Sequence, residues 1–158
     1  MKSGEINPSR KISIAVVDDE EVMRKLVYDV LKAEGYEVDS FATSQEALEK
    51  IKKGNFDFIL TDIKMPDLDG VELVKRIHQI NPEIGAIFMT GYADLLSAQE
   101  ALKEGAYDYI LKPFDLNEVR KSVAQAIEKT DSLEEKAKEK GLAALLEVDL
   151  NIYKSGDK

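Results

Sequence analysis

The chain has 158 residues, of which 44% are hydrophobic and 34% are charged, and its formal net charge is −9. This composition is typical of a soluble globular protein and excludes a chain that is disordered throughout. The acidic balance argues against binding DNA or an anionic membrane through overall charge. Because cysteine is absent, disulfides, zinc thiolate sites and thiol nucleophiles are excluded as well.

The N-terminal residues, MKSGEINPSRK, lack the apolar run of a signal peptide. No stretch of the sequence approaches the ~20 apolar residues of a membrane span. Together with the lack of cysteine, these features are compatible with a reducing cytoplasm. We therefore expect a cytoplasmic protein that does not contact a membrane.

Strand-like runs alternate with helical patterns along the chain. In chain order, the predicted elements are a strand at residues 11–17, a helix at 20–34, a strand at 36–41, a helix at 43–54, a strand at 56–61, a helix at 69–82, a strand at 84–90, a helix at 93–105, a strand at 107–111 and a helix from about residue 115. The first, third and fourth strands are mostly continuous apolar runs, as in parallel strands covered on both faces. The alternation predicts an α/β fold of (βα)₅ type, a doubly wound parallel five-stranded sheet with helices on both faces.

Polar residues and glycines mark the ends of several predicted helices. Gly35 and Gly54 are expected to cap the C-termini of the first and second helices. Thr43 and Glu46 form a capping box at the start of the second helix. Asp69 is expected to cap the N-terminus of the third helix.

The predicted core domain covers residues 11–130 and follows an N-terminal extension at 1–10. Residues 131–158 are highly charged at first and then apolar, and they are too short for a second output domain. They could extend the last helix, although Gly141 weakens an unbroken helix by about 1 kcal/mol relative to Ala. A helical linker and a tail folded back over the domain both stay open.

Chemically active side chains follow the predicted strand ends. Asp18 and Asp19 follow the first strand, Asp62 follows the third, Thr90 ends the fourth, and Lys112 follows the fifth. In open α/β sheets, ligands bind beyond the carboxyl ends of the strands. We therefore expect these five side chains to converge on one rim of the sheet.

The types of residue at this rim indicate phosphate chemistry. Three crowded carboxylates need a cation in order to stay ionised together. Oxygen ligands without histidine or cysteine favour a hard ion, above all Mg²⁺, which keeps waters that phosphate oxygens can replace. A lysine and a threonine can bind other phosphoryl oxygens, and an aspartate can form an acyl phosphate. The set therefore favours phosphoryl transfer onto or from an aspartate.

Four motifs carry a resemblance to a known family: VVDDEE at 16–21, ILTDIKMPDLDG at 59–70, FMTGYA at 88–93 and YILKPF at 109–114. In these motifs the chain resembles the receiver domains of two-component response regulators, over about residues 11–130. The resemblance implies a flavodoxin-like fold with strand order 2-1-3-4-5. It also implies a sensor histidine kinase or a histidine phosphotransfer protein as the phosphoryl donor. The domain would catalyse its own phosphorylation and dephosphorylation and would not turn over a separate substrate.

The resemblance implies a role for each matching rim residue. Asp62 is the expected phospho-acceptor, and Lys112 is expected to hold a phosphoryl oxygen. Asp19 is the expected direct Mg²⁺ ligand, and Asp18 is expected to act mainly through water. Asp62 and the backbone carbonyl of Lys64 complete the expected protein ligands.

The resemblance also implies a switch. Thr90 is the expected switch hydroxyl, and Tyr109 stands at the aromatic switch position, although it could also be an exposed strand residue. The Lys112–Pro113 bond is expected to be cis. Phosphorylation is expected to change the surface of residues 93–105 and 107–129, the candidate output or dimer face. No direct binding of nucleic acid by this chain is expected.

Simpler interpretations of several acidic residues stay open. Asp18 or Asp19 could cap the first helix. Asp67 and Asp69 suggest a calcium loop, but the ligand spacing is incomplete. The single histidine, His78, lies on the polar side of its predicted helix and is interpreted as a surface residue rather than a phosphocarrier.

Two other functions also stay open. A Mg²⁺-dependent phosphohydrolase could use the same aspartate as its nucleophile. Many such enzymes place an acid/base aspartate two residues later, where this chain has Lys64. A pure interaction module could keep the fold without phosphorylation, although the retention of all five rim residues argues against it.

The domain context and the oligomeric state of the protein stay open as well. The segment YDYILKPFDLNEV, at 107–119, resembles receivers that precede ATPase and DNA-binding domains in transcriptional activators. The chain is therefore either a stand-alone receiver or a fragment that retains a linker helix. A homodimer could form through the candidate output face or through the C-terminal helix.

Overall fold

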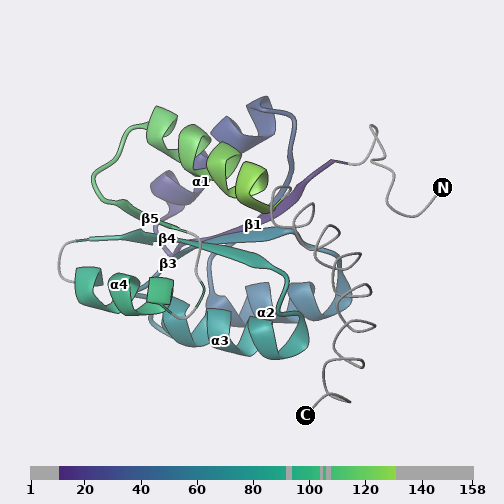
Figure 1. The fold of residues 1–158 in the computed structure, drawn as a ribbon, viewed down its shortest axis with the longest axis vertical. Helices are drawn as coiled ribbons and strands as arrows, with labels where there is room; N and C mark the ends of the chain where they lie inside the picture. The colour runs from purple at the N-terminus through teal and green to yellow at the C-terminus, as the bar shows by residue number, and fades with distance from the viewer. Residues whose placement is uncertain (1–10, 92–93, 104, 106–107, 131–158) are drawn as a thin grey trace, which may run out of the picture. The chain divides into compact units, whose positions relative to one another are not determined.

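The computed structural model describes residues 11–91, 94–103, 105 and 108–130. Within them the elements are β1 (Ser13–Val17), α1 (Glu21–Ala33), β2 (Glu37–Phe41), α2 (Ser44–Lys53), β3 (Phe58–Asp62), α3 (Gly70–Ile80), β4 (Gly85–Thr90), α4 (Leu95–Lys103) and β5 (Asp108–Leu111), and residues 116–130 are helical (Figure 1). The described strands form one parallel sheet in the order β2-β1-β3-β4-β5, which confirms the predicted fold. The predicted extensions at 1–10 and 131–158 lie outside the described residues.

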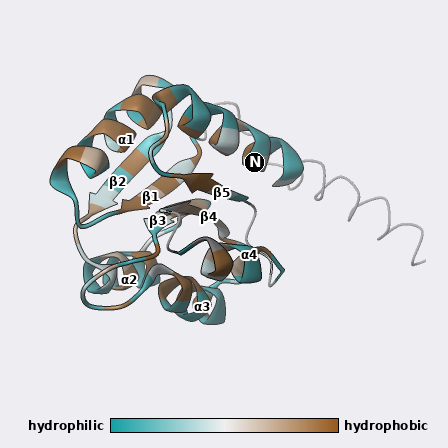
Figure 2. Cartoon of the chain, turned by 90° about the vertical axis from the view of Figure 1, so that its left-hand side faces the viewer, coloured by the Kyte–Doolittle hydropathy of each residue, from teal (hydrophilic) through white to brown (hydrophobic). Residues whose placement is uncertain are grey.

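Helices cover both faces of the sheet, as predicted. Figure 1 shows α2, α3 and α4 on one face and α1 with the helical residues 116–123 on the other. Figure 2, turned by 90°, shows the same three layers, with hydrophobic strands in the middle layer. This arrangement removes the apolar side chains of the central strands from water on both sides, which is the main driving force for the fold.

The buried strands are the ones with continuous apolar sequence. Every residue from Ile14 to Val17 is fully buried in β1, and β3 and β4 are buried along their whole lengths. Helix α1 packs Val27 and Leu31 into the core, and α3 packs Leu73 and Ile77. The prediction that these strands are covered on both faces is therefore confirmed.

The helix ends follow the predicted capping signals. The Thr43 hydroxyl accepts a hydrogen bond from the Glu46 amide (3.1 Å), and the Asp69 carboxylate accepts one from the Glu72 amide (2.9 Å). Gly35 follows α1 with a φ of +95°, a conformation that favours glycine. These local interactions satisfy helix-terminal N–H and C=O groups that have no partner within the helix.

The described helices differ little from the predicted ranges. Helix α4 covers Leu95–Lys103, whereas a helix at 93–105 was expected, and residues 93 and 104 lie outside the described residues. Among the described helices, none combines the length and the apolar character that crossing a bilayer requires.

Candidate functional site

The register of the sheet brings four strand ends to one rim. Strand β1 ends level with β3, because Val17 pairs with Thr61, and β4 ends level with β5, because Thr90 pairs with Leu111. In parallel strands, ends that are level in register lie at the same edge of the sheet. The residues that follow these pairs therefore meet at the rim where the sequence places the site.

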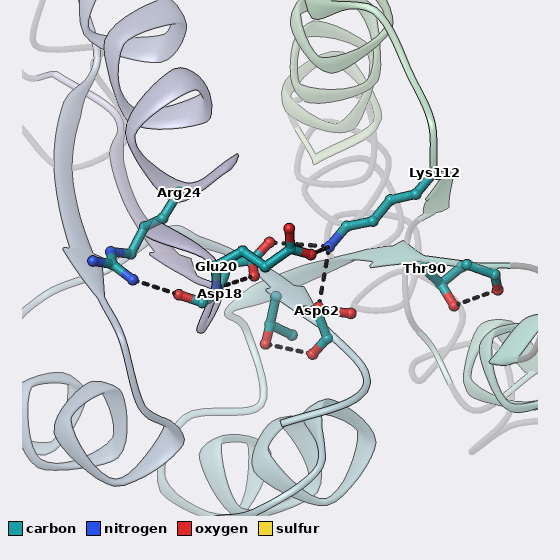
Figure 3. Close-up of polar contacts among 8 residues, drawn as sticks. Asp18, Glu20, Arg24, Asp62, Thr90 and Lys112 are labelled. Carbon is teal, nitrogen blue, oxygen red and sulfur yellow. Dashed lines mark hydrogen bonds and ion pairs between the residues drawn. The ribbon is translucent and has the colours of Figure 1, made fainter. Parts of the chain in front are cut away.

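Lys112 is the centre of the rim. Its Nζ lies 3.1 Å from Oδ2 of Asp18, 3.1 Å from Oδ2 of Asp62 and 3.7 Å from Oε1 of Glu20. Figure 3 shows the lysine reaching across from the end of β5 to all three carboxylates. The Lys112–Pro113 peptide bond is cis, as predicted.

The carboxylates differ in their access to solvent. The side chain of Asp18 is fully buried and that of Asp62 is 11% exposed, whereas that of Glu20 is 67% exposed. The Lys112 side chain is 17% exposed. The two aspartates and the lysine thus form a nearly buried group, and Glu20 closes it at the solvent side.

Hydrogen bonds to the β1–α1 loop, to β2 and to α1 hold Asp18 in place. The Asp18 amide donates to the Phe41 carbonyl (3.1 Å), and Oδ1 of Asp18 accepts from the Glu20 amide (2.9 Å). From α1, Nη1 of Arg24 donates to the Asp18 carbonyl (2.8 Å), as Figure 3 shows. The acidic loop is therefore set by hydrogen bonds before any ligand binds.

The electrostatics of the rim favour a cation. Burial raises the pKa of Asp18, and its hydrogen bond from Glu20 and the nearby Lys112 offset this only in part. Burial lowers the pKa of Lys112, but Asp18 and Asp62 outweigh it and raise that pKa above its usual value. Among the described residues, three carboxylates here face one ammonium group, so negative charge is in excess.

The rim can hold a metal ion. Oxygen atoms of Asp18, Glu20 and Asp62 all lie within 4.8 Å of one another, so a single ion can contact all three. An oxygen-only set of this kind suits a hard divalent cation. Glu20 is a residue that the sequence reasoning missed, although it lies in the VVDDEE motif next to the predicted ligands.

Asp19, the expected direct ligand, lies beside this carboxylate group and not in it. Its side chain is exposed and lines a neighbouring hollow of about 530 Å³ together with Lys64 and Asp69. The hollow adjoins the start of the β3–α3 connection. The proposed roles of Asp19 and of the Lys64 carbonyl as metal ligands stay predictions.

The two predicted switch residues occupy different environments. Thr90 is fully buried, and its hydroxyl donates to the carbonyl of Gly91 (3.1 Å). Figure 3 shows Thr90 on the side of Asp62 away from Arg24. Tyr109 is partly buried and packs against the core, so the alternative of an exposed strand residue is wrong. Their roles as switches stay predictions.

Gly70, at the start of α3, lies very close to the backbone of Asp62. A Cβ atom at Gly70 would lie directly against the Asp62 carbonyl oxygen, 3.0 Å from its carbon and 3.1 Å from Cα of Ile63. The Gly70 amide also donates to the Ile63 carbonyl (2.7 Å). The glycine is therefore required because the start of α3 approaches the candidate acceptor backbone too closely for any side chain.

We expect Gly70→Ala to lower the free energy of unfolding by about 1–3 kcal/mol, because the methyl group forces the backbone near Asp62 to shift. Urea denaturation measures the change. Gly91→Ala is the matched control, since a Cβ there meets nothing within 4 Å. Equal stabilities of the two variants would show that the close approach at Gly70 is not a constraint.

The acids of the MPDLDG segment act as helix caps. Asp69 caps α3, as described above, and Oδ2 of Asp67 accepts from the Gln45 amide of α2 (2.9 Å). These roles occupy their carboxylates, and neither belongs to the group of described acids that can share an ion. The structure therefore favours caps over a calcium loop.

The capping alternative for Asp18 is not supported. The N-cap residue of α1 is Glu20, which makes no side-chain capping bond within the described residues, and Asp18 accepts from the Glu20 amide instead of from an amide of the first turn.

The environment of His78 also differs from the expected surface position. His78 is half-buried, and its Nε2 lies 2.7 Å from the Ile84 carbonyl, so it joins α3 to the turn before β4.

Comparisons with known proteins agree with this geometry. A family model described as the response regulator receiver domain matches residues 14–124. The transcriptional regulatory protein ZraR of Klebsiella oxytoca is 37% identical over 120 residues, which are 76% of this chain and 27% of ZraR. Sporulation initiation phosphotransferase F of Bacillus subtilis is 38% identical over 110 residues, 70% of this chain and 89% of that protein.

The solved structures give the same result. The solution structure of the beryllofluoride-activated NtrC4 receiver domain dimer has a TM-score of 0.70 at 36% identity, and the match covers 75% of this chain and 98% of that chain. The fold and its rim thus define an α/β signalling domain of the flavodoxin-like class. Within that class, the chain belongs to the receiver domains of two-component response regulators. It spans only 27% of ZraR and 25% of the regulator DctD of Rhizobium meliloti.

Proposed function

We propose that this receiver accepts a phosphoryl group on Asp62 from the phosphohistidine of a sensor histidine kinase or histidine phosphotransfer protein. The observation that carries the proposal is the position of Lys112, whose Nζ lies 3.1 Å from carboxylate oxygens of both Asp18 and Asp62. A phosphoryl group on Asp62 would have a cation within reach of its oxygens. The neighbouring acidic group offers a place for a metal ion beside it.

The proposed metal is Mg²⁺. Asp18 and Asp62 would hold it, with Asp19 and the Lys64 carbonyl as further ligands and Glu20 at the solvent side. Oxygen ligands fit Mg²⁺, which usually binds proteins through one or two carboxylates and keeps several waters. When bound, the ion offsets negative charge on the transferring phosphoryl group.

The reaction is a direct displacement at phosphorus. A carboxylate oxygen of Asp62 forms the new P–O bond while the P–N bond of the donor phosphohistidine breaks, and the bonding electron pair returns to the imidazole nitrogen. Lys112 donates to a phosphoryl oxygen. In later hydrolysis, water attacks the acyl phosphate, inorganic phosphate leaves, and the Asp62 carboxylate is restored. In this proposal the domain catalyses both steps on itself and turns over no separate substrate.

Phosphorylation is proposed to act through Thr90 and Tyr109. The Thr90 hydroxyl, which now donates to Gly91, would turn toward the phosphoryl group, and Tyr109 would follow. The surface that responds includes α4, where the side chain of Leu96 is 76% exposed. The NtrC4 receiver is a dimer in its beryllofluoride-activated state. By analogy, we propose that this surface binds a second copy, an output partner or an output domain of a longer protein.

Phosphorylation by a small acyl phosphate tests the proposed function. We expect the purified chain to gain one phosphoryl group in Mg²⁺ and none after chelation of the metal, because the acidic rim repels an anionic donor without a cation. Intact mass spectrometry measures the label. Continuous release of phosphate from a phosphate ester would indicate a phosphohydrolase, and the absence of any label in Mg²⁺ would indicate a pure interaction module.

A further inference from the structure

The loop that follows Asp62 is bonded to the N-terminus of α2. Oδ2 of Asp67 accepts from the Gln45 amide (2.9 Å), and Oδ1 accepts from the Ser44 amide (3.3 Å). In the other direction, the Ser44 hydroxyl donates to the Leu68 carbonyl (2.6 Å). Ser44 is fully buried, so this bond is sheltered from water. The two elements are joined by three hydrogen bonds, in both directions.

These bonds satisfy groups that α2 cannot satisfy by itself. The first N–H groups of a helix have no partner within the helix, and a carboxylate is a strong acceptor for them. Slight burial would raise the pKa of Asp67, but the amides of Gln45 and Ser44 and the nearby backbone outweigh it and hold that pKa below its usual value. Asp67 is therefore a charged cap that α2 receives from another element.

The loop at residues 63–69 also returns to Asp62 where α3 begins, at Gly70. Gly70 lies directly against the Asp62 carbonyl, and its amide donates to Ile63. Lys64, whose carbonyl is a proposed metal ligand, lies between this contact and Asp67 along the chain. A shift of the loop at the phosphorylation site therefore has to be accommodated at the start of α2. Figures 1 and 2 show α2 and α3 side by side beneath the sheet.

We propose that Asp67 and Ser44 are positioning residues for the phosphorylation site, which they couple to the first turn of α2. This inference rests on the proposed function, since it concerns ligands bound at Asp62. By linkage, a ligand that orders the loop stabilises the first turn of α2, and an intact first turn strengthens binding of that ligand by the same factor. Helix α2 is then a second element, besides α4 and β5, that reports the state of the site.

Thr43 provides a matched control. It caps the same helix turn, because its hydroxyl accepts from the Glu46 amide, and among the described residues its side chain bonds only to Glu46 of α2. Thr43→Ala therefore weakens the first turn without breaking the connection to the loop. Asp67→Ala removes two of the three bonds of the connection, Ser44→Ala removes the third, and the double variant removes all three, whereas Asp67→Asn retains one acceptor oxygen.

Amide hydrogen exchange at Ala47 tests the coupling. This amide donates to the backbone carbonyl of Thr43 (3.3 Å), a bond that none of the substitutions removes, so its exchange reports opening of the first turn. Mg²⁺ with beryllofluoride, and Mg²⁺ alone, are the probes. We expect the ligand to slow Ala47 exchange about fivefold or more in the wild type and in Thr43→Ala. We expect less slowing in Asp67→Ala and in Ser44→Ala, and none in the double variant.

Mg²⁺ affinity gives the reciprocal readout. We expect Asp67→Ala to weaken Mg²⁺ binding by the same factor by which it reduces the ligand-induced slowing of Ala47 exchange. Asp67→Asn and Thr43→Ala, which keep the connection in part or in full, are expected to weaken Mg²⁺ binding less. Asp67→Asn keeps the comparison possible if the alanine variants do not fold. Equal ligand-induced slowing in all variants would overturn the coupling while leaving the proposed function intact. Failure of the wild type to bind Mg²⁺ would overturn the proposed function itself.

Discussion

Asp62→Asn is expected to abolish phosphorylation by a small acyl phosphate. The amide of asparagine is nearly the same size as the carboxylate but lacks the anionic oxygen that attacks phosphorus. Asp62 is buried at the end of β3 and lies within hydrogen-bonding distance of Lys112. Because the two side chains are nearly equal in size, the substitution removes the charge without changing the packing volume. Intact mass spectrometry after incubation in Mg²⁺ is expected to show no label.

Two measurements make this result specific. Asp39→Asn changes an exposed acid on β2 that pairs with Ala15 of β1, before the strand ends that form the rim, and is expected to leave the labelling rate unchanged. Circular dichroism establishes that the Asp62→Asn variant is folded. Labelling of Asp62→Asn at the wild-type rate would mean that another residue is the acceptor.

Lys112→Ala is expected to slow phosphorylation about 100-fold, because a positioned cation that stabilises developing negative charge is removed. The same change removes a positive charge that competes with a metal ion for Asp18 and Asp62. Mg²⁺ binding is therefore expected to be retained or tightened. Single-turnover labelling measures the rate, and calorimetric titration measures Mg²⁺ affinity.

Lys112→Arg separates charge from geometry. The guanidinium keeps the positive charge but differs in shape and hydrogen-bonding directions, so the labelling rate is expected to fall between those of the wild type and Lys112→Ala. The alanine variant is also expected to lose any phosphorylation-driven change in size, which gel filtration measures. Wild-type labelling in Lys112→Ala, or loss of Mg²⁺ binding, would contradict the assigned role.

Much of the fold was predictable from local patterns. Apolar runs such as Ile14–Val17 indicate strands covered on both faces, and the alternation with amphipathic segments indicates a doubly wound sheet. The caps Thr43 and Asp69 were predictable because each bonds within its own helix, three residues along the chain. Interactions between residues close in sequence depend on spacing alone.

The candidate site was predictable in part for a similar reason. Parallel strands place their carboxyl ends at one edge, so Asp18, Asp62 and Lys112 were expected to meet there, and the structure brings them within hydrogen-bonding distance. The sequence did not predict which neighbouring acid joins this group at the rim. In the run of acids after β1, Glu20 turns toward Lys112 and Asp19 lines the adjacent hollow, because the backbone path of the loop sets the direction of each side chain.

By itself, the sequence determined the alternation of strands and helices, the local caps, and the residues that stand at the strand ends. Only the tertiary structure decided that Asp67 caps α2 from 22 residues away. It also decided that Gly70 lies close to the Asp62 backbone and that Glu20 completes the acidic group. These contacts join segments distant in sequence. Their geometry depends on how helices pack across the sheet, which residue spacing along a single element does not specify.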